Sequence, residues 1–491
     1  LPGQSLSLEL LSHQEQQIPN TVIEPCQEKS RCHSRRKASF QFETSLYQRG
    51  SAFPEALLQT EEVGLFHGVR LIRVGLHPVR TQGERLTITT ELQAQANFVG
   101  RPQTIRLSPF QLRVLSALAV NGTAVAEAVT QTAEPETLWV VVADALEEAL
   151  QPFLEWKRQK GLHVECFKTS QTGNSPTQIK NFLQTLYDKA QPKPTYLLLV
   201  GNEKTLPPVV EKTGEGDAVA DYAYSLLEGK DALPDVFYGR LLADNADEVT
   251  TQIQRWIAYE KAPKGDWFSN ALTVASEEGK QPSDEEYAQQ LETLFSRHGF
   301  KKTNRLLEKD GSAAVQTLWD ALKDGRSWVA YFGHGSGTEW LSMKDPFGVD
   351  EITQTENAEK LPFIVDAACD NAAWTSFSPC FGKAWVTAHS KGEPRGAVAY
   401  LGGSTAITWH EPAVMSIGIA KYHFEKSIPS VGASVFAGQM YLLEQMGFKP
   451  STLDNLRWYN LFGDPSLELR TAPPKEFLLT ATEKKVPGGI E

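Results

Sequence analysis

From Leu138 onward, short apolar runs alternate with amphipathic stretches of helical length. The run "LWVVVADA" is followed by "LEEALQPFLEWKRQKG", "HVECFKT", "SPTQIKNFLQTLYDKA" and "TYLLLVGN". Runs that are apolar almost throughout are typical of parallel strands buried on both faces. The pattern therefore predicts an α/β fold in which helices flank both faces of a parallel sheet.

The same alternation resumes in the second half of the chain. A strand in "ALTVASEE" precedes two helices, one from Ser283 to about His298 and one in "AAVQTLWDALKDG". The strands "SWVAYFG", "LPFIVDAAC" and "GAVAYLGG" follow. Functional side chains of such sheets lie just beyond the carboxyl ends of the strands. His334 and Cys369 each end one strand, so they meet if those strands are neighbours.

The two ends of the chain have a different texture. Up to about residue 130, stretches such as "GVRLIRVGLHPVR" and "ERLTITTELQAQANF" alternate apolar with polar residues, as half-buried antiparallel strands do. We therefore expect a separate β-rich domain over residues 1–130. Residues 472–491 indicate a linker with two prolines and the start of a C-terminal β module.

Charge and composition exclude several classes of function. The chain has 48 basic and 60 acidic residues and a formal net charge of −12, which disfavours nucleic acid and anionic lipid as partners. No apolar run reaches the roughly 18 to 20 residues of a membrane span, and the first residues lack the pattern of a signal peptide. We expect any export signal to be absent already.

The five cysteines form no pattern typical of a structural zinc site. Cys26 and Cys32 are close enough in sequence for a local disulfide in an oxidising compartment, and the sequence leaves open whether they form it.

A cysteine nucleophile needs a base and donors for the oxyanion. Cys369 and His334 fit these two roles, and the N–H of Gly335, together with that of Cys369, is the candidate oxyanion hole. Each residue also has an ordinary interpretation, because a cysteine after an apolar strand is usually inert in the core and a histidine in a glycine-rich turn is usually solvated.

Four blocks of the chain resemble successive blocks of the gingipain family of cysteine endopeptidases: "YFGHGSGTEW", "LPFIVDAACDNAAW", "SPCFGKAW" and "LFGDPSLELRT". The similarity covers roughly residues 138–471 and implies a catalytic domain with the caspase-like fold. It also implies that His334 is the general base, that Cys369 is the nucleophile, and that Glu278 in "VASEEG" orients the imidazole.

The resemblance further implies a preference for basic residues. Asp284 matches the position at which arginine-specific members hold the guanidinium, although the loop before it is shorter here. Asp284 also has a structural interpretation, because Ser283 and Glu286 form a capping box at the start of the same helix.

Trp409 resembles the aromatic residue that closes over the aliphatic part of the bound basic side chain. Lysine-specific relatives have their selecting aspartate at the position of Pro412 here, which favours arginine. Glu411 lies one residue away, so acceptance of both arginine and lysine stays open.

The family also implies how the protein is made and used. Residues 1–130 are similar in placement to a prodomain that inhibits its own enzyme, which predicts a zymogen that is secreted or held at the cell surface and acts on proteins or peptides. Arg31, Arg35 and Arg36 lie in an exposed-looking basic run and are candidate sites of self-cleavage. The resemblance allows a structural calcium ion whose ligands the sequence does not identify, and it requires no cofactor for catalysis.

The sequence bears on several other functions. A serine hydrolase built on Ser404 in "GGSTA" is disfavoured, because Ala406 replaces the second glycine of a nucleophile elbow and no His and Asp follow in the usual order. A sortase-like transpeptidase and a lysine-preferring endopeptidase would use the same cysteine and histidine. The intact set of His334, Cys369 and Glu278 disfavours a catalytically silent binding protein.

Overall fold

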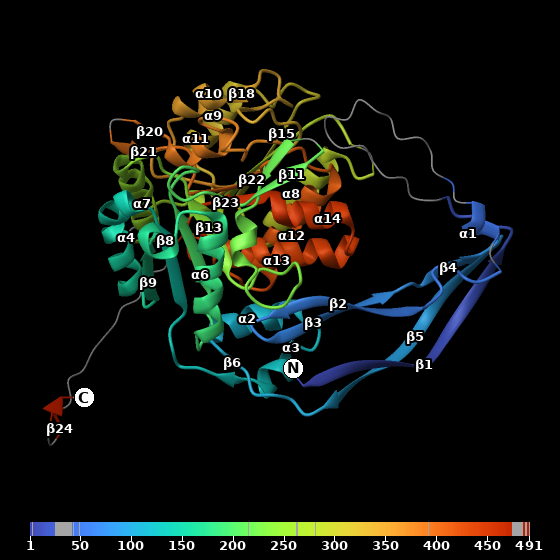
Figure 1. Ribbon diagram of the computed structural model, residues 1–491. Helices are drawn as coiled ribbons and strands as arrows, with labels where there is room; N and C mark the ends of the chain where they lie inside the picture. Colours follow the sequence, from blue (N-terminus) through green and yellow to red (C-terminus); the bar gives the residue numbers. More distant parts are fainter. Residues whose placement is uncertain are drawn as a thin grey trace.

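The computed structural model of the protein contains a ten-stranded sheet covered by helices (Figure 1). The structure describes residues 1, 3–24, 42, 44–48, 50–214, 216–261, 264–279, 281–390, 392–473, 485–486 and 489–490. The strands are ordered β15 (Lys302–Leu307), β14 (Asn270–Ala275), β16 (Trp328–Phe332), β19 (Phe363–Ala367), β22 (Ala399–Gly403), β23 (Tyr459–Phe462), β13 (Phe237–Leu241), β10 (Tyr196–Val200), β8 (Thr137–Val142) and β9 (His163–Lys168).

The sheet consists of two parallel halves that run in opposite directions. Every neighbouring pair is parallel except β22 and β23, which pair antiparallel with Gly403 opposite Tyr459. The predicted α/β class is confirmed, but the expectation of one uniformly parallel sheet misses this reversal. As a result, the carboxyl ends of β14, β16, β19 and β22 lie at the edge where β23, β13 and β10 begin.

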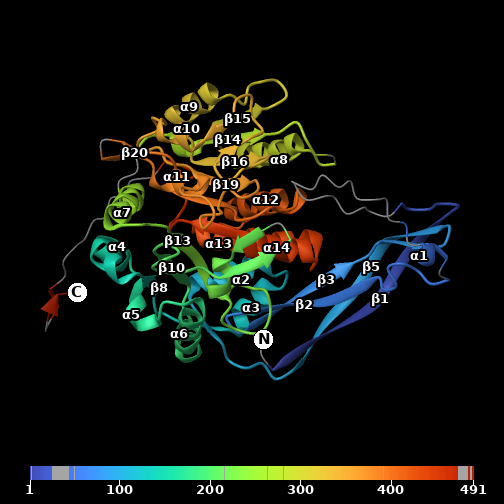
Figure 2. The same cartoon turned by 45° about the horizontal axis from the view of Figure 1, so that its top comes forward.

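Helices cover both faces, as the alternating pattern predicts (Figure 2). One layer contains α4 (Glu147–Gln159), α7 (Ala246–Lys261) and α11 (Phe381–Thr387), and the other contains α8 (Asp284–Arg297), α12 (His410–Glu425), α13 (Val431–Met446) and α14 (Pro450–Trp458). Further helices are α6 (Pro176–Lys189), α9 (Val315–Asp324) and α10 (Val349–Thr353). Apart from the partly exposed edge strands β15 and β9, the sheet strands are almost completely buried between these layers, because most of their side chains are apolar on both faces.

The N-terminal region is rich in strands and extends away from the helical layers (Figure 1). The long strands β1 (Gln4–Pro19) and β5 (Arg85–Gly100) pair antiparallel, with β4 (Val79–Gln82) beside β5, and β2 (Leu58–Phe66) pairs with β3 (Val69–Leu76). Helices α2 (Pro109–Leu118) and α3 (Gly122–Ala128) occupy a stretch for which we expected strands. The helix α2 starts at a capping box that Ser108 and Gln111 form.

The tip of the β2–β3 hairpin contacts the helical body. The ring of Phe66 stacks on Phe436 of α13, with 5.0 Å between centroids, and lies 6.0 Å from Phe237 at the start of β13. The backbone N–H of Leu65 donates to Asp231 at 3.0 Å, and that of Gly68 to Glu228 at 2.9 Å. The N-terminal region is therefore attached through both apolar and polar contacts.

Several predictions concern residues outside those that the structure describes. These are Cys26, Cys32, Arg31, Arg35 and Arg36. In the tail, β24 (Lys485–Val486) and β25 (Gly489–Ile490) form a short antiparallel pair.

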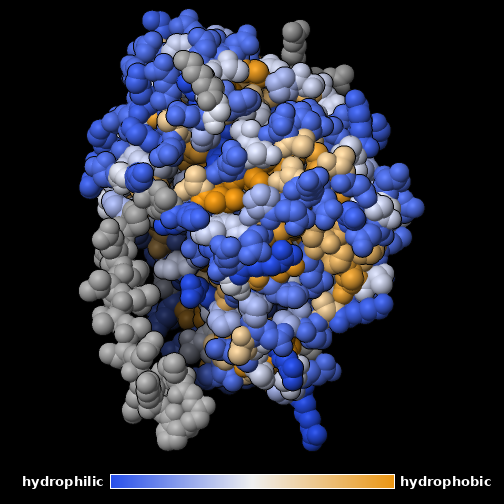
Figure 3. All heavy atoms as spheres, turned by 90° about the vertical axis from the view of Figure 1, so that its left-hand side faces the viewer, coloured by the Kyte–Doolittle hydropathy of each residue, from blue (hydrophilic) through white to orange (hydrophobic). Residues whose placement is uncertain are grey.

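One face of the molecule shows how polar and apolar side chains are distributed on the surface. The face drawn in Figure 3 is mainly hydrophilic, with a limited band of apolar side chains. Among the residues that the structure describes, no helix combines the length and apolar character needed to cross a bilayer.

A buried ion cluster joins α4 and α7 to the segment after β23. The Nζ of Lys157 lies 2.9 Å from Glu260 and 2.6 Å from Asp464, and all three side chains are almost completely buried. Burial alone would lower the pKa of Lys157, but the two carboxylates raise it above its ordinary value. Lysine therefore stays charged in this core position.

Replacement of Lys157 by Met should leave two buried carboxylates without this cation, and we expect a loss of about 3–5 kcal/mol in the free energy of unfolding. The matched control is Lys160→Met, which removes a partly exposed partner of Glu260, and we expect it to cost about 1 kcal/mol or less. Urea titration measures both, and equal losses would contradict a special role for Lys157.

Candidate active site

The parallel pairing of β16 with β19 brings the two predicted catalytic residues to one place. Phe332 pairs with Ala367 at the ends of these strands, and two residues beyond this pair stand His334 and Cys369. The N–H of Gly333 still reaches the carbonyl of Ala367, at 3.5 Å. The prediction that these two strands are neighbours in the sheet is therefore confirmed.

Glu278 and Trp409 surround the imidazole of His334. The Nε2 atom of His334 lies 3.2 Å from Oε1 of Glu278, and the side chain of His334 is one-quarter exposed. The ring of Trp409 meets the imidazole edge to face, with 5.0 Å between centroids. The Glu278 contact fits the role of an acid that orients the base.

The loop after β16 that carries His334, the histidine loop, is held by hydrogen bonds to its backbone. The N–H of His334 donates to the Ser342 hydroxyl at 3.0 Å, and its carbonyl accepts from the Tyr331 hydroxyl at 2.8 Å. The Tyr331 ring stacks on Trp340 with 4.5 Å between centroids. These contacts fix where the loop leaves β16, and therefore where the imidazole stands.

Cys369 is fully buried at the bottom of a narrow cavity. Its Sγ atom accepts a hydrogen bond from the N–H of Ile407 at 3.4 Å. The described residues that line the cavity are Asp284, Phe332, Gly333, Ala367, Ala368, Cys369, Ile407, Thr408 and Trp409. Three of the predicted site residues, Cys369, Asp284 and Trp409, thus share one cavity.

Gly335 lies directly against the loop after β19 that carries Cys369, the cysteine loop. A Cβ atom on Gly335 would stand 2.4 Å from the carbonyl oxygen of Cys369 and 2.8 Å from Nδ2 of Asn371. In the surrounding turn, the N–H of Ser336 donates to the carbonyl of Glu339, and the N–H of Leu341 donates to the carbonyl of His334. The amide of Gly335 is not a donor in either of these two hydrogen bonds. Only glycine fits in this gap.

Asp284 is the first residue of α8 and is almost completely buried. Its Oδ2 atom accepts from the Ser276 hydroxyl at 2.6 Å, and its Oδ1 atom from Nε1 of Trp409 at 3.0 Å. The capping box of Ser283 and Glu286 is present as predicted, so both interpretations of this stretch are compatible.

Glu411 lies apart from this arrangement. It is buried in the first turn of α12, and the cavity lining does not include it among the described residues. The neighbouring His410 makes a 2.8 Å hydrogen bond through Nδ1 with the Tyr287 hydroxyl.

Ser404 has a structural role. Its buried hydroxyl lies 2.7 Å from the carbonyl oxygen of Val219 and 3.0 Å from that of Trp458. This position does not present an exposed nucleophile, in agreement with the sequence argument against a serine hydrolase.

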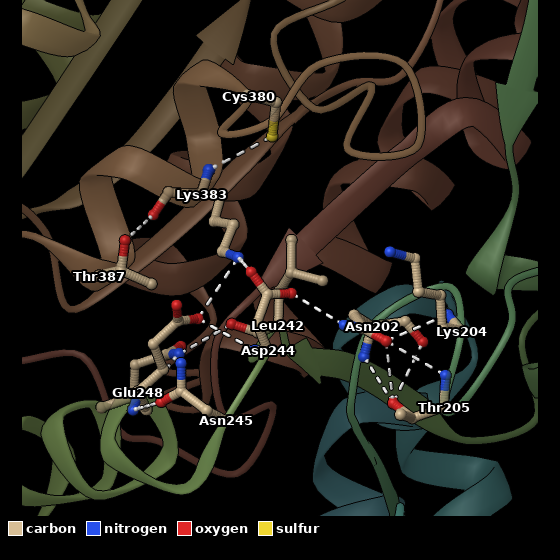
Figure 4. A network of polar contacts seen from close by, with 11 residues as sticks. Asn202, Lys204, Thr205, Leu242, Asp244, Asn245, Glu248, Cys380, Lys383 and Thr387 are labelled. Carbon is tan, nitrogen blue, oxygen red and sulfur yellow. Dashed lines mark hydrogen bonds and ion pairs between the residues drawn. The ribbon is translucent and has the colours of Figure 1, made fainter.

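Cys380 is also structural (Figure 4). It is the fully buried N-cap of α11, its sulfur accepts from the N–H of Lys383 at 3.4 Å, and burial raises the pKa of its thiol to about 12. The Lys383 ammonium pairs with Asp244, which also accepts from Asn202 at 2.9 Å. The network joins α11 to the ends of β10 and β13 in the other half of the sheet.

Sequence reasoning missed a pair of residues beside Cys369. Asn371 donates its N–H to the carbonyl of Cys369 at 2.7 Å, its Nδ2 to Asp366 at 2.9 Å, and its Oδ1 accepts from Gly337 N–H at 3.0 Å. Asn371 thereby ties the cysteine loop to the histidine loop. Asp366 was the visible signal, because it is a carboxylate within an otherwise apolar strand.

No calcium ligand can be assigned from the described residues. Within them, no group of three or more His, Cys, Asp and Glu side chains is placed to hold a metal ion. A structural calcium ion stays a prediction.

Residues 131–470 match the family model described as peptidase family C25. The chain belongs to this family. Family C25 relatives include gingipain R2 of Porphyromonas gingivalis, 31% identical over 356 residues that cover 70% of this chain and 47% of the relative. Lys-gingipain W83 of the same organism is 25% identical over 402 residues, 78% of this chain and 22% of the relative. The chain thus spans about half the length of gingipain R2 and a smaller share of Lys-gingipain W83.

Solved structures of the C25 family have the same fold. The Arg-specific cysteine proteinase gingipain R superimposes with a TM-score of 0.65 at 30% identity, covering 69% of this chain and 79% of that one. A complex of RgpB pro- and mature domains from Porphyromonas gingivalis also gives 0.65, at 29% identity, over 69% and 81% of the two chains. The gingipain-like fold expected from the sequence is confirmed.

The buried carboxylate of Asp366 should make stability depend on pH. Burial raises the pKa of Asp366 from 3.8 to about 6, although donors on Tyr400, Asn371 and Trp340 oppose this. A carboxyl whose pKa is higher in the folded protein stabilises it fully below its unfolded pKa and loses this contribution as the pH rises through the folded pKa. Relative to Asp366→Asn, the wild-type free energy of unfolding should therefore fall by about 3 kcal/mol between about pH 4 and pH 7. Urea titrations across this range measure the difference, and a constant difference would contradict the assignment.

Proposed function

We propose that the protein is a cysteine endopeptidase that cleaves after basic residues and prefers arginine. The observation that carries this proposal is the shared cavity, in which the sulfur-bearing Cys369 and the buried carboxylate of Asp284 both take part. One group has the chemistry to attack a peptide carbonyl, and the other has the charge to hold the basic side chain before the scissile bond.

In the proposed mechanism, His334 takes the proton of the Cys369 thiol and the sulfur attacks the carbonyl carbon. The N–H groups of Gly335 and Cys369 stabilise the oxyanion. The imidazolium, stabilised by Glu278, then gives its proton to the leaving amine, and the C–N bond breaks. Water, deprotonated by His334, hydrolyses the thioester, which frees the acid and restores the thiol.

Preference for arginine rests on Asp284. A guanidinium can donate two parallel hydrogen bonds to this carboxylate, whereas an ammonium offers a single compact charge. Trp409 donates to Oδ1 of this carboxylate and Ser276 to Oδ2, and Trp409 lines the same cavity, where its indole can stack on the aliphatic part of an entering side chain. Glu411 lies outside the cavity lining, which weakens the case for dual acceptance of lysine.

The N-terminal region is proposed to be an inhibitory prodomain. The hairpin tip at Phe66 packs against Phe237 at the start of β13, and this end of β13 lies on the same sheet edge as His334 and Cys369. A domain attached there stands beside the cleft. Secretion or surface location, self-cleavage in the basic run, and hydrolysis in preference to transpeptidation belong to the same proposal and rest on the family.

Release of a chromophore from matched arginyl and lysyl peptides tests the peptidase. We expect faster cleavage after arginine, no activity in Cys369→Ala, and a loss of about 10²-fold in kcat/KM for arginine in Asp284→Asn. The control is Glu285→Gln, which removes a neighbouring charge in the same helical turn that pairs with Lys309. Activity in Cys369→Ala would overturn the mechanism, and preference for lysine would overturn the role of Asp284.

A side chain at Gly335 should disrupt the oxyanion hole. Gly335→Ala must push the histidine and cysteine loops apart, and we expect kcat to fall by roughly 10²–10³-fold with little change in secondary structure. Gly214→Ala is the matched control, because a Cβ there meets no atom within 4 Å. Full activity in Gly335→Ala, measured with the arginyl peptide, would remove this residue from the site.

A further inference from the structure

Ser276 is the first residue of the loop between β14 and α8, and its hydroxyl connects two other positions of this stretch. Ser276 is 2% exposed and follows β14 directly. Its Oγ atom donates to Oδ2 of Asp284 at 2.6 Å and accepts from the N–H of Glu278 at 3.0 Å. The N–H of Asp284 in turn donates to the carbonyl of Glu278 at 3.2 Å.

Both oxygens of Asp284 are thus connected to His334. Oδ2 is hydrogen-bonded to Ser276, and Ser276 is hydrogen-bonded to the N–H of Glu278. The carboxylate of Glu278 lies 3.2 Å from Nε2 of His334. Oδ1 is hydrogen-bonded to Trp409, whose ring meets the imidazole edge to face. The residue proposed to bind substrate and the residue proposed to orient the base therefore share one hydroxyl.

The chemistry of this position requires a hydroxyl. A serine can donate to a carboxylate and accept from an amide at the same time. Acceptance from the amide two residues later is a common turn, but donation to a buried carboxylate eight residues later is not part of that turn. Alanine would leave one oxygen of Asp284 with a lost donor and the Glu278 amide with a lost acceptor.

We propose that Ser276 is a positioning residue that couples recognition of the basic side chain at Asp284 to the orientation of His334 by Glu278. The inference rests on the proposed peptidase function and deepens it. An entering guanidinium competes with Trp409 for Oδ1 of Asp284, while Ser276 keeps Oδ2 in place. The same hydroxyl holds the Glu278 backbone, so the carboxylate stays at the imidazole when the substrate is bound.

Steady-state kinetics of Ser276→Ala on an arginyl peptide tests the coupling. We expect kcat to fall about tenfold. The limb of the pH–rate profile that reports the imidazole should shift to lower pH, because a loosened Glu278 stabilises the imidazolium less. The matched control is Ser283→Ala, whose hydroxyl caps the same helix by accepting from the N–H of Glu286 at 3.2 Å. It should lower stability and leave the profile in place.

A double-mutant cycle shows whether Ser276 acts through Glu278. The variant Ser276→Ala/Glu278→Gln should retain a kcat within about twofold of Glu278→Gln alone, because the second change removes what Ser276 positions. Multiplicative losses, or a Ser276→Ala profile identical to that of Ser283→Ala, would overturn the inference while leaving the peptidase intact. A wild-type enzyme that cleaves neither arginyl nor lysyl peptides would instead refute the proposed function.

Discussion

The register between β16 and β19 is the constraint on which the site depends. With Phe332 opposite Ala367, the residues two positions later, His334 and Cys369, leave the sheet side by side. Both strands are buried between helical layers, so their pairing cannot slip without moving apolar side chains out of their packing. A slip of one residue would also displace the two functional groups by about 3.3 Å. The packing of the core therefore fixes the spacing of His334 and Cys369.

The antiparallel pairing of β22 with β23 decides what else lies near that pair. Because the two halves of the sheet run in opposite directions, the carboxyl ends of β16 and β19 share an edge with the start of β13. Phe66, at the tip of the β2–β3 hairpin, packs against Phe237 at the start of β13. The reversal thus brings the N-terminal region to the edge that carries His334 and Cys369, whereas a uniformly parallel sheet would place the start of β13 at the opposite edge.

Buried carboxylates in this region are tolerated because each has several donors. Asp284 accepts from Ser276 and Trp409 and stands at the start of α8, where the helix dipole favours a negative charge. Asp366 accepts from Trp340, Asn371 and Tyr400. All three donors to Asp366 reach Oδ2, and its Oδ1 atom is buried without a hydrogen bond from the residues that the structure describes. Carboxylates with several donors hold loops in a single geometry, and the loops carrying Glu278, His334 and Cys369 are each attached to one of these two groups.

Local sequence determined much of this protein by itself. Apolar periodicity identified the strands and their flanking helices, because a buried parallel strand has the same composition wherever it occurs. His334 and Cys369 could be picked out because each follows one of these strands. The uniform composition of the strands also hides their direction, so only the tertiary structure decided the order of the sheet and its reversal at β22. Glu278 and Asp284 could be chosen from the sequence only through family resemblance. Only the tertiary structure decided the contacts of Ser276 and Asn371. Ser276 donates to a carboxylate eight residues later, and Asn371 accepts from Gly337 in a loop 34 residues earlier. No residue pattern specifies these contacts, because the path of each loop decides which polar groups meet.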